Sequence, residues 1–350
     1  MSIDFSRLLP LGWSNFFLAQ LPLDRLDTVH PARVVRVERS GYRVATTAGD
    51  MLATLAGRFQ HEHADQRPTV GDWVLLQEDA PVIVECLQRR TLLTRRQSGG
   101  IDRQAIAANV DLMLVVSGLD AEFNLHRIER YLVMAAQAGV TPLVVLTKQD
   151  LAENAAAAVE QVRARLPAGA DVLSVDARYD SLSERLAPWL SPGTTLIVVG
   201  SSGVGKSTLV NNLAGGEVQS TGGTRRDSKG RHTTTARALI RLPGGACIID
   251  IPGMREVGLT TERGVNEQFR SITDLARACR FIDCTHEEEP GCAVRAAVEH
   301  GELAADVWTH YLKLRAEERH QVAEHERRRC ERVFGKMVRS ALATKQRSGR

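Results

Sequence analysis

Short, continuous apolar runs punctuate the middle of the chain and predict buried β-strands. These runs are residues 141–146, 171–173, 194–199 and 246–249. Residues 207–213 come soon after the third run and have the composition of the first turns of a helix. The pattern predicts an α/β domain in which a mostly parallel sheet carries helices on both faces.

The N-terminal part of the chain has a different pattern, in which apolar and polar residues alternate over short stretches. Residues 33–37, 42–45, 71–76 and 82–84 show it, with turn residues between them. Closely spaced short strands predict a small antiparallel β-barrel of the oligonucleotide-binding type over residues 31–96. Basic side chains at the end of this region either contact phosphates or solvate a linker; they are Arg89, Arg90, Arg95 and Arg96.

A glycine-rich segment between the run 194–199 and the helix at 207–213 matches the phosphate-loop pattern at every fixed position. Its residues are Gly200, Ser201, Ser202, Gly203, Val204, Gly205, Lys206 and Ser207, with Thr208 next in the helix. The glycines let consecutive backbone amides turn inward around phosphate oxygens, and the helix N-terminus adds partial positive charge. Lys206 is predicted to reach the β- and γ-phosphates, and the Ser207 hydroxyl to ligate Mg²⁺.

A base-reading motif follows the run 141–146 and consists of Thr147, Lys148, Gln149 and Asp150. The Asp150 carboxylate can accept hydrogen bonds from N1 and the exocyclic amine of guanine, a donor pair that adenine lacks. The aliphatic stem of Lys148 would cover the face of the base. Thr147 stands where many GTPases carry Asn, which predicts an altered orienting hydrogen bond. Residues 174–177 are a further candidate for contacting the base.

The two halves of this site occur in reversed order along the chain. In an ordinary GTPase the phosphate loop opens the domain, and the base-reading motif lies near its end. Here the base-reading motif comes first. Both motifs follow predicted strands, and ligands bind at the carboxyl ends of the strands in an open α/β sheet. The order therefore predicts a circularly permuted GTPase domain that uses GTP with Mg²⁺.

A switch-like segment at 250–253 follows the last apolar run. Asp250 would hold Mg²⁺ through water, and the Gly253 amide would sense the γ-phosphate. Met254 stands where many GTPases have a glutamine that orients the attacking water, and a thioether cannot bond as an amide does. This predicts slow hydrolysis, or catalysis completed by another group or partner.

A second switch-like segment, residues 221–235, is rich in glycine and charge and is predicted to be a mobile loop. It ends in three consecutive threonines, one of which is predicted to reach Mg²⁺, and Thr234 is the middle one. His232 has two readings: a catalytic residue that positions water or the γ-phosphate, and a solvent-facing loop histidine.

Three of the six cysteines lie close together in the chain with a histidine among them; the set is Cys279, Cys284, His286 and Cys292. Three thiolates and an imidazole form a closed tetrahedral ligand set for one structural Zn²⁺. Disulfides are not expected, because the chain shows no export signal and the other cysteines are scattered. Buried cysteines without a metal are the alternative.

Basic residues are concentrated at the C-terminal end. Residues 313–350 hold twelve Lys or Arg against five Glu, a net charge of +7, whereas the whole 350-residue chain has +3. Such a tail fits either the phosphates of RNA or a solvated helical face. No apolar stretch is long enough to span a bilayer, which predicts a soluble cytoplasmic protein without membrane contact.

Taken together, these motifs resemble the small-ribosomal-subunit-dependent GTPase A family, bacterial circularly permuted GTPases that act late in small-subunit assembly. The resemblance covers residues 30–315. The motifs that carry it are the base reader at 147–150 ahead of the loop 200–208, the segment 230–235, the cysteine–histidine set continuing through 289–294, and the entry-like segment 104–111.

The resemblance implies three domains, which we place at 31–96 for an oligonucleotide-binding barrel, 97–262 for a permuted GTPase domain and 263–315 for a helical zinc domain. An N-terminal extension at 1–30, which matches no motif, and a basic helix or tail at 316–350 flank them. It implies a GTP hydrolase, monomeric when free, that binds the small ribosomal subunit and its rRNA and is stimulated by that subunit. Two alternatives stay open. One is an RNA-binding module whose GTP site is only regulatory, and the other is a divergent paralogue with a different RNA partner.

Overall fold

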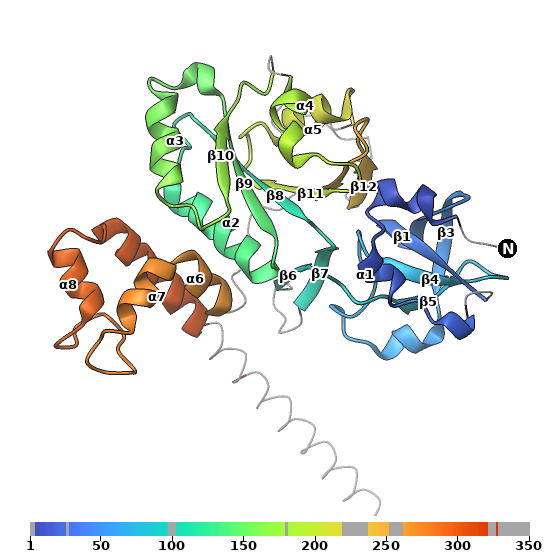
Figure 1. The fold of residues 1–350 in the computed structure, drawn as a ribbon, viewed down its shortest axis with the longest axis horizontal. Coiled ribbons are helices and arrows are strands. Elements are labelled where there is room, and N and C mark those ends of the chain that lie inside the picture. The colour runs from blue at the N-terminus through green and yellow to red at the C-terminus, as the bar shows by residue number, and fades with distance from the viewer. Residues whose placement is uncertain are drawn as a thin grey trace, which may run out of the picture. The chain divides into compact units, whose positions relative to one another are not determined.

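The computed structural model describes residues 4–25, 28–96, 103–178, 181–218, 237–251, 262–320 and 327. The chain divides into two compact units (Figure 1). The first unit comprises the residues up to 95 and from 103 to 257, and the second comprises 96–102 and the residues from 258 onward. Among the residues described, no helix combines the length and the apolar character needed to cross a membrane.

Five strands of the first unit close into a barrel. They are β1 (Val29–Glu38), β2 (Gly41–Thr46), β3 (Gly49–Leu55), β4 (Trp73–Gln77) and β5 (Val82–Cys86). The strands pair in the order β1-β2-β3-β5-β4, and β4 pairs with β1 to complete the ring. The predicted antiparallel arrangement holds except between β3 and β5, which run parallel. Val34, Val44 and Val74 belong to the barrel's core, and η3 (Gly57–His61) contributes Phe59 to it.

The N-terminal segment packs against the outside of this barrel. It contains η1 (Phe5–Leu11), α1 (Asn15–Leu18) and η2 (Leu23–Arg25). Leu8 and Phe17 are fully buried, and the Trp13 ring meets the edge of Trp73 on β4 at 4.7 Å between centroids. A segment without a recognisable motif is therefore part of the hydrophobic core, because its aromatic residues cover the apolar outer face of β4.

A buried arginine ties three parts of the first unit together. Arg33 on β1 is only 1% exposed, and burial lowers its pKa. Its guanidinium donates to the carbonyls of Leu11 in η1, Gly71 before β4 and Asn109 before the parallel sheet. Gly12 is left-handed, with φ of 86°, and a Cβ there would lie 2.8 Å from Arg33 Nη1. The N-terminal segment can approach the arginine this closely only through a glycine.

A six-stranded sheet forms the rest of the first unit. Its strands are β8 (Leu112–Gly118), β9 (Thr141–Thr147), β10 (Asp171–Ser174), β11 (Thr195–Gly200), β12 (Ala238–Arg241) and β13 (Cys247–Asp250). The order is β10-β9-β8-β11-β13-β12, and all neighbours are parallel except β12 and β13. The four apolar runs of the sequence are thus strands β9, β10, β11 and β13. A single bridge from Ala238 on β12 to Arg36 joins this sheet to the barrel.

Helices cover both faces of this sheet, as the sequence predicts (Figure 1). One face packs against α2 (Leu125–Ala138) and α3 (Ala155–Arg163), and the other against α4 (Leu182–Arg185), η5 (Ala187–Trp189) and α5 (Lys206–Ala214). Alternate residues of β8 divide between the two cores: Met113 faces α2, whereas Leu114 faces α5. A strand buried on both sides has a continuous apolar sequence, which is the signal that predicted β9, β10, β11 and β13.

The strand pair β6 (Leu92–Arg96) and β7 (Arg103–Ala108) links the barrel to the sheet. Two of the arginines considered as phosphate contacts have structural partners there. Arg89 donates to both oxygens of the fully buried Asp72 at 2.8 Å, and Arg90 donates to Asp111 at 2.8 Å. A buried carboxylate such as Asp72 needs a partner of this kind, so Arg89 stabilises the fold. Arg90 and Asp111 form a half-exposed ion pair, with side chains 37% and 32% exposed.

The second unit is helical in its described part. It contains α6 (Glu262–Gln268), α7 (Arg270–Ala276), α8 (Ala293–Glu299) and a further helix over residues 305–320. Phe269 meets the rings of His310 and Tyr311 at 6.0 and 5.6 Å, and Leu314 is fully buried. Tyr311 and Leu314 are therefore on the buried side of the last helix, and Leu303 is buried just before its start. Most of the basic tail lies outside the described residues.

Candidate nucleotide site and metal centre

The carboxyl ends of the parallel strands bring the two nucleotide motifs to one edge of the sheet. Gly200, which ends β11, pairs with Val116 on β8, and Gly118 at the end of β8 pairs with Thr147 at the end of β9. On the other side of β11, β13 ends at Asp250. The phosphate loop, the base-reading motif and Asp250 therefore leave neighbouring strands at the same edge.

The phosphate loop requires its glycines. A Cβ on Gly200 would lie 2.2 Å from the Val116 carbonyl oxygen, and Gly203 and Gly205 have φ of 81° and 92°. These are left-handed conformations that side chains disfavour. Helix α5 then begins at Lys206, whose ammonium donates to the carbonyl oxygens of Gly200, at 2.9 Å, and Ser201. The lysine is thus folded back over the loop that it is predicted to serve.

Thr147 connects the two halves of the site directly. Its hydroxyl donates to the Val204 carbonyl oxygen in the phosphate loop at 2.6 Å, with the Ser117 carbonyl oxygen at 3.3 Å. The side chain is 1% exposed, and the Cβ position of Gly205 lies only 3.6 Å from the hydroxyl oxygen. The altered hydrogen bond predicted for this threonine is therefore a short, buried bond to the phosphate loop.

Lys148 and Asp120 form an ion pair that the sequence did not reveal. Lys148 has a left-handed backbone, with φ of 58°, and its ammonium donates to the Asp120 carboxylate. That hydrogen bond holds the pKa of Asp120 below its usual value. The only signal for Asp120 in the sequence is its place just after a buried strand, at the same edge as the base-reading motif. The pair fixes the aliphatic stem that is predicted to cover a base.

Asp150 and the segment 174–177 follow neighbouring strands, β9 and β10. Asp150 belongs to the turn η4 (Gln149–Leu151), and Val175 donates its backbone N–H to Leu146 at the end of β9 at 2.8 Å. Arg178, just beyond this segment, donates to the Asp150 carboxylate at 2.6 Å. An open hollow of about 550 Å³ adjoins these residues, lined by Ala177, Arg178, Thr208, Asn211, Asn212 and Glu217.

The described residues include only part of the predicted switch machinery. Ser207 lies in the first turn of α5, and Asp250 is the last residue of β13. His232, Thr234, Gly253 and Met254 lie outside the described residues.

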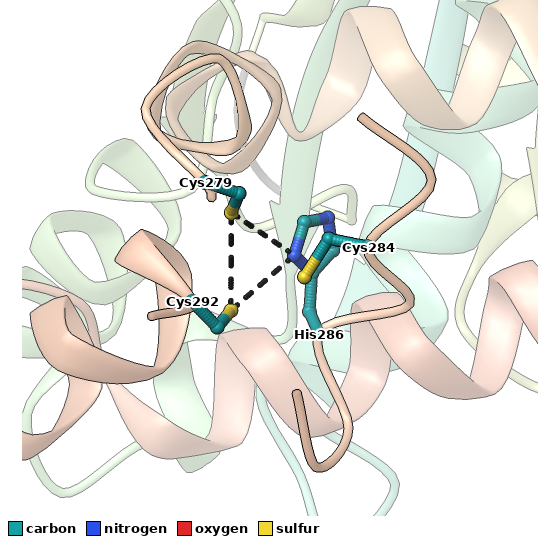
Figure 2. Close-up of side chains that lie close together, drawn as sticks. All are labelled: Cys279, Cys284, His286 and Cys292. Carbon is teal, nitrogen blue, oxygen red and sulfur yellow. Dashed lines mark hydrogen bonds between the residues drawn. The ribbon is translucent and has the colours of Figure 1, made fainter. Parts of the chain in front are cut away.

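The cysteine–histidine set of the second unit comes together as predicted from its spacing (Figure 2). Nδ1 of His286 lies 3.6 Å from the Cys279 sulfur and 3.5 Å from the Cys292 sulfur, and those two sulfurs are 3.9 Å apart. Cys284 completes a group whose ligand atoms all lie within 4.8 Å of one another. A tetrahedral zinc ion would separate two sulfurs by about 3.8 Å and a sulfur from a nitrogen by about 3.6 Å. The donor set and its spacing are therefore compatible with zinc.

The loop that carries these ligands is held by its own hydrogen bonds. Glu289 accepts from the backbone N–H of Thr285 at 2.8 Å and from its hydroxyl at 2.6 Å, and these bonds lower the pKa of Glu289 to about 2. Cys292 caps α8 by accepting from the Arg295 backbone N–H at 3.4 Å. Burial lowers the pKa of His286 and so favours the neutral imidazole that binds metals.

Comparisons with known proteins agree with this geometry. A family model described as RsgA GTPase matches residues 86–260. The small ribosomal subunit biogenesis GTPase RsgA 2 of Vibrio vulnificus is 44% identical over 97% of this chain and 96% of its own length. The small ribosomal subunit biogenesis GTPase RsgA of Xylella fastidiosa strain M23 is 49% identical over 82% of this chain and 87% of its own length. The chain belongs to the RsgA GTPase family. As an RsgA GTPase it is a GTP hydrolase, and the resemblance read from the motifs is confirmed.

Two solved structures share the RsgA GTPase fold seen here. YjeQ from Thermotoga maritima aligns with a TM-score of 0.63 and 27% identity over 83% of this chain and 98% of its own. YloQ, described as a circularly permuted GTPase, aligns with a TM-score of 0.59 and 25% identity over 84% and 96% of the two chains. The circular permutation that the motif order predicts is thus confirmed.

Proposed function

We propose that this RsgA GTPase binds the small ribosomal subunit and couples GTP hydrolysis to a late step in its maturation, with the subunit stimulating hydrolysis. The relatives that match most of the chain carry names that state small-subunit biogenesis. The observation that carries the substrate assignment is the buried bond from Thr147 to Val204, because it joins a base reader and a phosphate loop in one site.

The residues of the phosphate half divide between those that bind the phosphates and those that bind Mg²⁺. The loop amides from Gly200 to Thr208 and the Lys206 ammonium hold the phosphates and stabilise the charge of the transferring group. Ser207, Thr234 and Asp250 supply hydroxyl and carboxylate oxygens, the ligands that Mg²⁺ prefers, and Gly253 contacts the γ-phosphate. Mg²⁺ would neutralise charge on the β- and γ-phosphate oxygens.

The base half selects guanine. Asp150 accepts from N1 and the exocyclic amine, and Lys148, steadied by Asp120, covers one face of the base. Gln149 and Thr147 complete the base-reading motif. ATP lacks the donor pair that the Asp150 carboxylate accepts, so GTP and GDP are the ligands.

Catalysis is completed on the ribosomal subunit. Met254 cannot orient water as glutamine does, so the subunit orders the loop that contains His232 and positions the attacking water only in the bound state. The barrel strand order is that of an oligonucleotide-binding fold, and together with the basic tail it supplies an RNA-binding surface.

The proposed layout keeps five segments: extension 1–30, barrel 31–96, permuted GTPase domain 97–262, zinc domain 263–315 and basic tail 316–350. The zinc ion would be held by Cys279, Cys284, His286 and Cys292, which together leave no open coordination position, so its role is to hold the loop in place. The protein acts in the cytoplasm as a monomer that joins its ribosomal partner.

The test is GTP hydrolysis by the purified protein with and without small ribosomal subunits. Large subunits and ATP are the controls, and Lys206→Ala separates activity of this site from contamination. We expect stimulation only by small subunits, only with GTP, and none in the Lys206→Ala variant, which should keep its zinc. Turnover that small subunits leave unchanged would refute the coupling and favour an RNA-binding protein with a regulatory GTP site.

A further inference from the structure

Arg178 touches the carboxylate proposed to read guanine. It lies in the turn after β10, and its Nη2 donates to Oδ2 of Asp150 at 2.6 Å. The two residues are 28 positions apart, on turns that follow neighbouring strands. The base-reading motif therefore receives a positive partner from a different loop.

Arg178 is itself held from the other side. Oδ1 of Asp176 accepts the Arg178 backbone N–H at 3.0 Å and lies 3.4 Å from Nε of the guanidinium. The side chain of Asp176 is 12% exposed, against 34% for Asp150 and 56% for Arg178. The least exposed carboxylate thus anchors the arginine, and the arginine reaches outward to the more exposed carboxylate.

The contact with Asp150 uses one guanidinium nitrogen and one carboxylate oxygen. A carboxylate has about four lone-pair sites, so this arrangement leaves Oδ1 and part of Oδ2 available as acceptors. Guanine presents two parallel donors, which require both oxygens to face the base in one plane. Asp150 sits on the short turn η4, where a carboxylate without a lateral partner would sample several rotations about its side-chain bonds.

We propose that Arg178 is a positioning residue for guanine selection. It fixes the plane of the Asp150 carboxylate so that both oxygens meet N1–H and the exocyclic amine together. Arg178 also lines the hollow that includes Thr208 of the phosphate-binding helix, which places it on the nucleotide side of the turn. This inference rests on the proposed role of Asp150 and adds a specificity residue to the same site.

The test compares GDP with IDP, because inosine keeps N1–H and lacks the exocyclic amine. For Arg178→Ala we expect GDP affinity to fall about three- to tenfold, the effect of losing one exposed ion pair and one ordered side chain. IDP presents only the N1–H donor, and a single Asp150 oxygen can rotate to accept it. The affinity for IDP should therefore fall less than the affinity for GDP, and the preference for GDP should shrink. Arg178→Lys keeps one donor and should recover part of that preference.

Arg163→Ala is the matched control. Arg163 is 54% exposed and pairs with Glu160 on α3. The Arg163→Ala variant therefore loses a similar surface ion pair away from the base-reading motif. It should leave both affinities unchanged. Equal loss of GDP and IDP binding in Arg178→Ala would overturn the proposal, because it would mean general damage to the turn. Tighter GDP binding would also overturn it, since Arg178 would then compete with guanine. A wild-type protein that binds ADP as well as GDP would instead refute the proposed function of the site.

Discussion

Replacing Thr147 by valine tests whether a threonine can join the two halves of the nucleotide site. Valine keeps the branched shape of the side chain and removes only the hydroxyl, which donates to the Val204 carbonyl oxygen at 2.6 Å. The position is 1% exposed, so water cannot replace the lost donor. The change therefore leaves a buried carbonyl of the phosphate loop without this partner.

The size of the effect follows from that burial. An unsatisfied buried polar group costs about 1–3 kcal/mol, more than the net value of an ordinary hydrogen bond. We expect Thr147→Val to lower the free energy of unfolding by this amount. Val204 belongs to the phosphate loop, so the loop also loses its alignment with the base-reading motif. A loss of about 1 kcal/mol in the bound state corresponds to a rise of about fivefold in the Kd for GDP.

Urea unfolding and GDP titration measure the two effects, and Thr147→Ser is the control because it keeps the hydroxyl. The serine variant should bind GDP nearly as wild type, with a small stability loss from the missing methyl group. If Thr147→Val matched wild type in both unfolding free energy and GDP affinity, the bond to Val204 would not organise the site.

Three further changes test other parts of the molecule. Asp150→Asn should lower kcat/KM for GTP at least about 100-fold and raise it for XTP, because the amide can donate to the xanthine carbonyl where the carboxylate could only accept; ATP hydrolysis is the control. Cys284→Ser should reduce bound zinc measured by metal analysis and make the second unit more sensitive to protease, while GDP binding in the first unit is kept. The Lys148 ammonium holds the pKa of Asp120 below 3.8, so this carboxylate stabilises the fold above that pH and the contribution is lost as pH falls further. Asp120→Asn should therefore lose less stability than wild type when urea unfolding is repeated below pH 3.8.

Four strands of the sheet could be predicted because burial on both faces leaves a continuous apolar run, but the central strand β8 (Leu112–Gly118), buried along its whole length, was missed. The run 194–199 became β11 (Thr195–Gly200), and the run 246–249 became β13 (Cys247–Asp250). The barrel gave a weaker signal. Strand β3 was missed because Ala53 is the only fully buried residue among its seven, so no alternation marks it. Its parallel pairing with β5 depends on closure of the barrel, which local sequence does not encode.

The N-terminal segment shows the limit of motif reasoning. Its fold depends on Trp13 meeting Trp73 and on Leu11 accepting from Arg33, contacts across 60 and 22 positions of sequence. The local sequence around either residue of such a pair does not indicate which distant residue it will contact. At the nucleotide site the motifs could likewise be recognised in the sequence, but their partners Asp120 and Arg178 could not be predicted. Those two residues come from separate loops and belong to no motif.

Permutation gives these tertiary contacts a specific importance. The base half of the site comes from a continuous stretch that ends at Arg178, and the phosphate half comes from the stretch that follows it along the chain. In the described part of the chain they meet through Thr147 and Val204, 57 positions apart, and through the longer contact of Asn212 with Ala177 at 3.5 Å. A base that settles on Asp150 can therefore influence the phosphate loop through a buried hydroxyl and the neighbouring strand ends. Because the Thr147 hydroxyl contacts the phosphate loop directly, we expect single substitutions at Thr147 to change nucleotide binding more than equally conservative changes at strand positions that do not touch this loop.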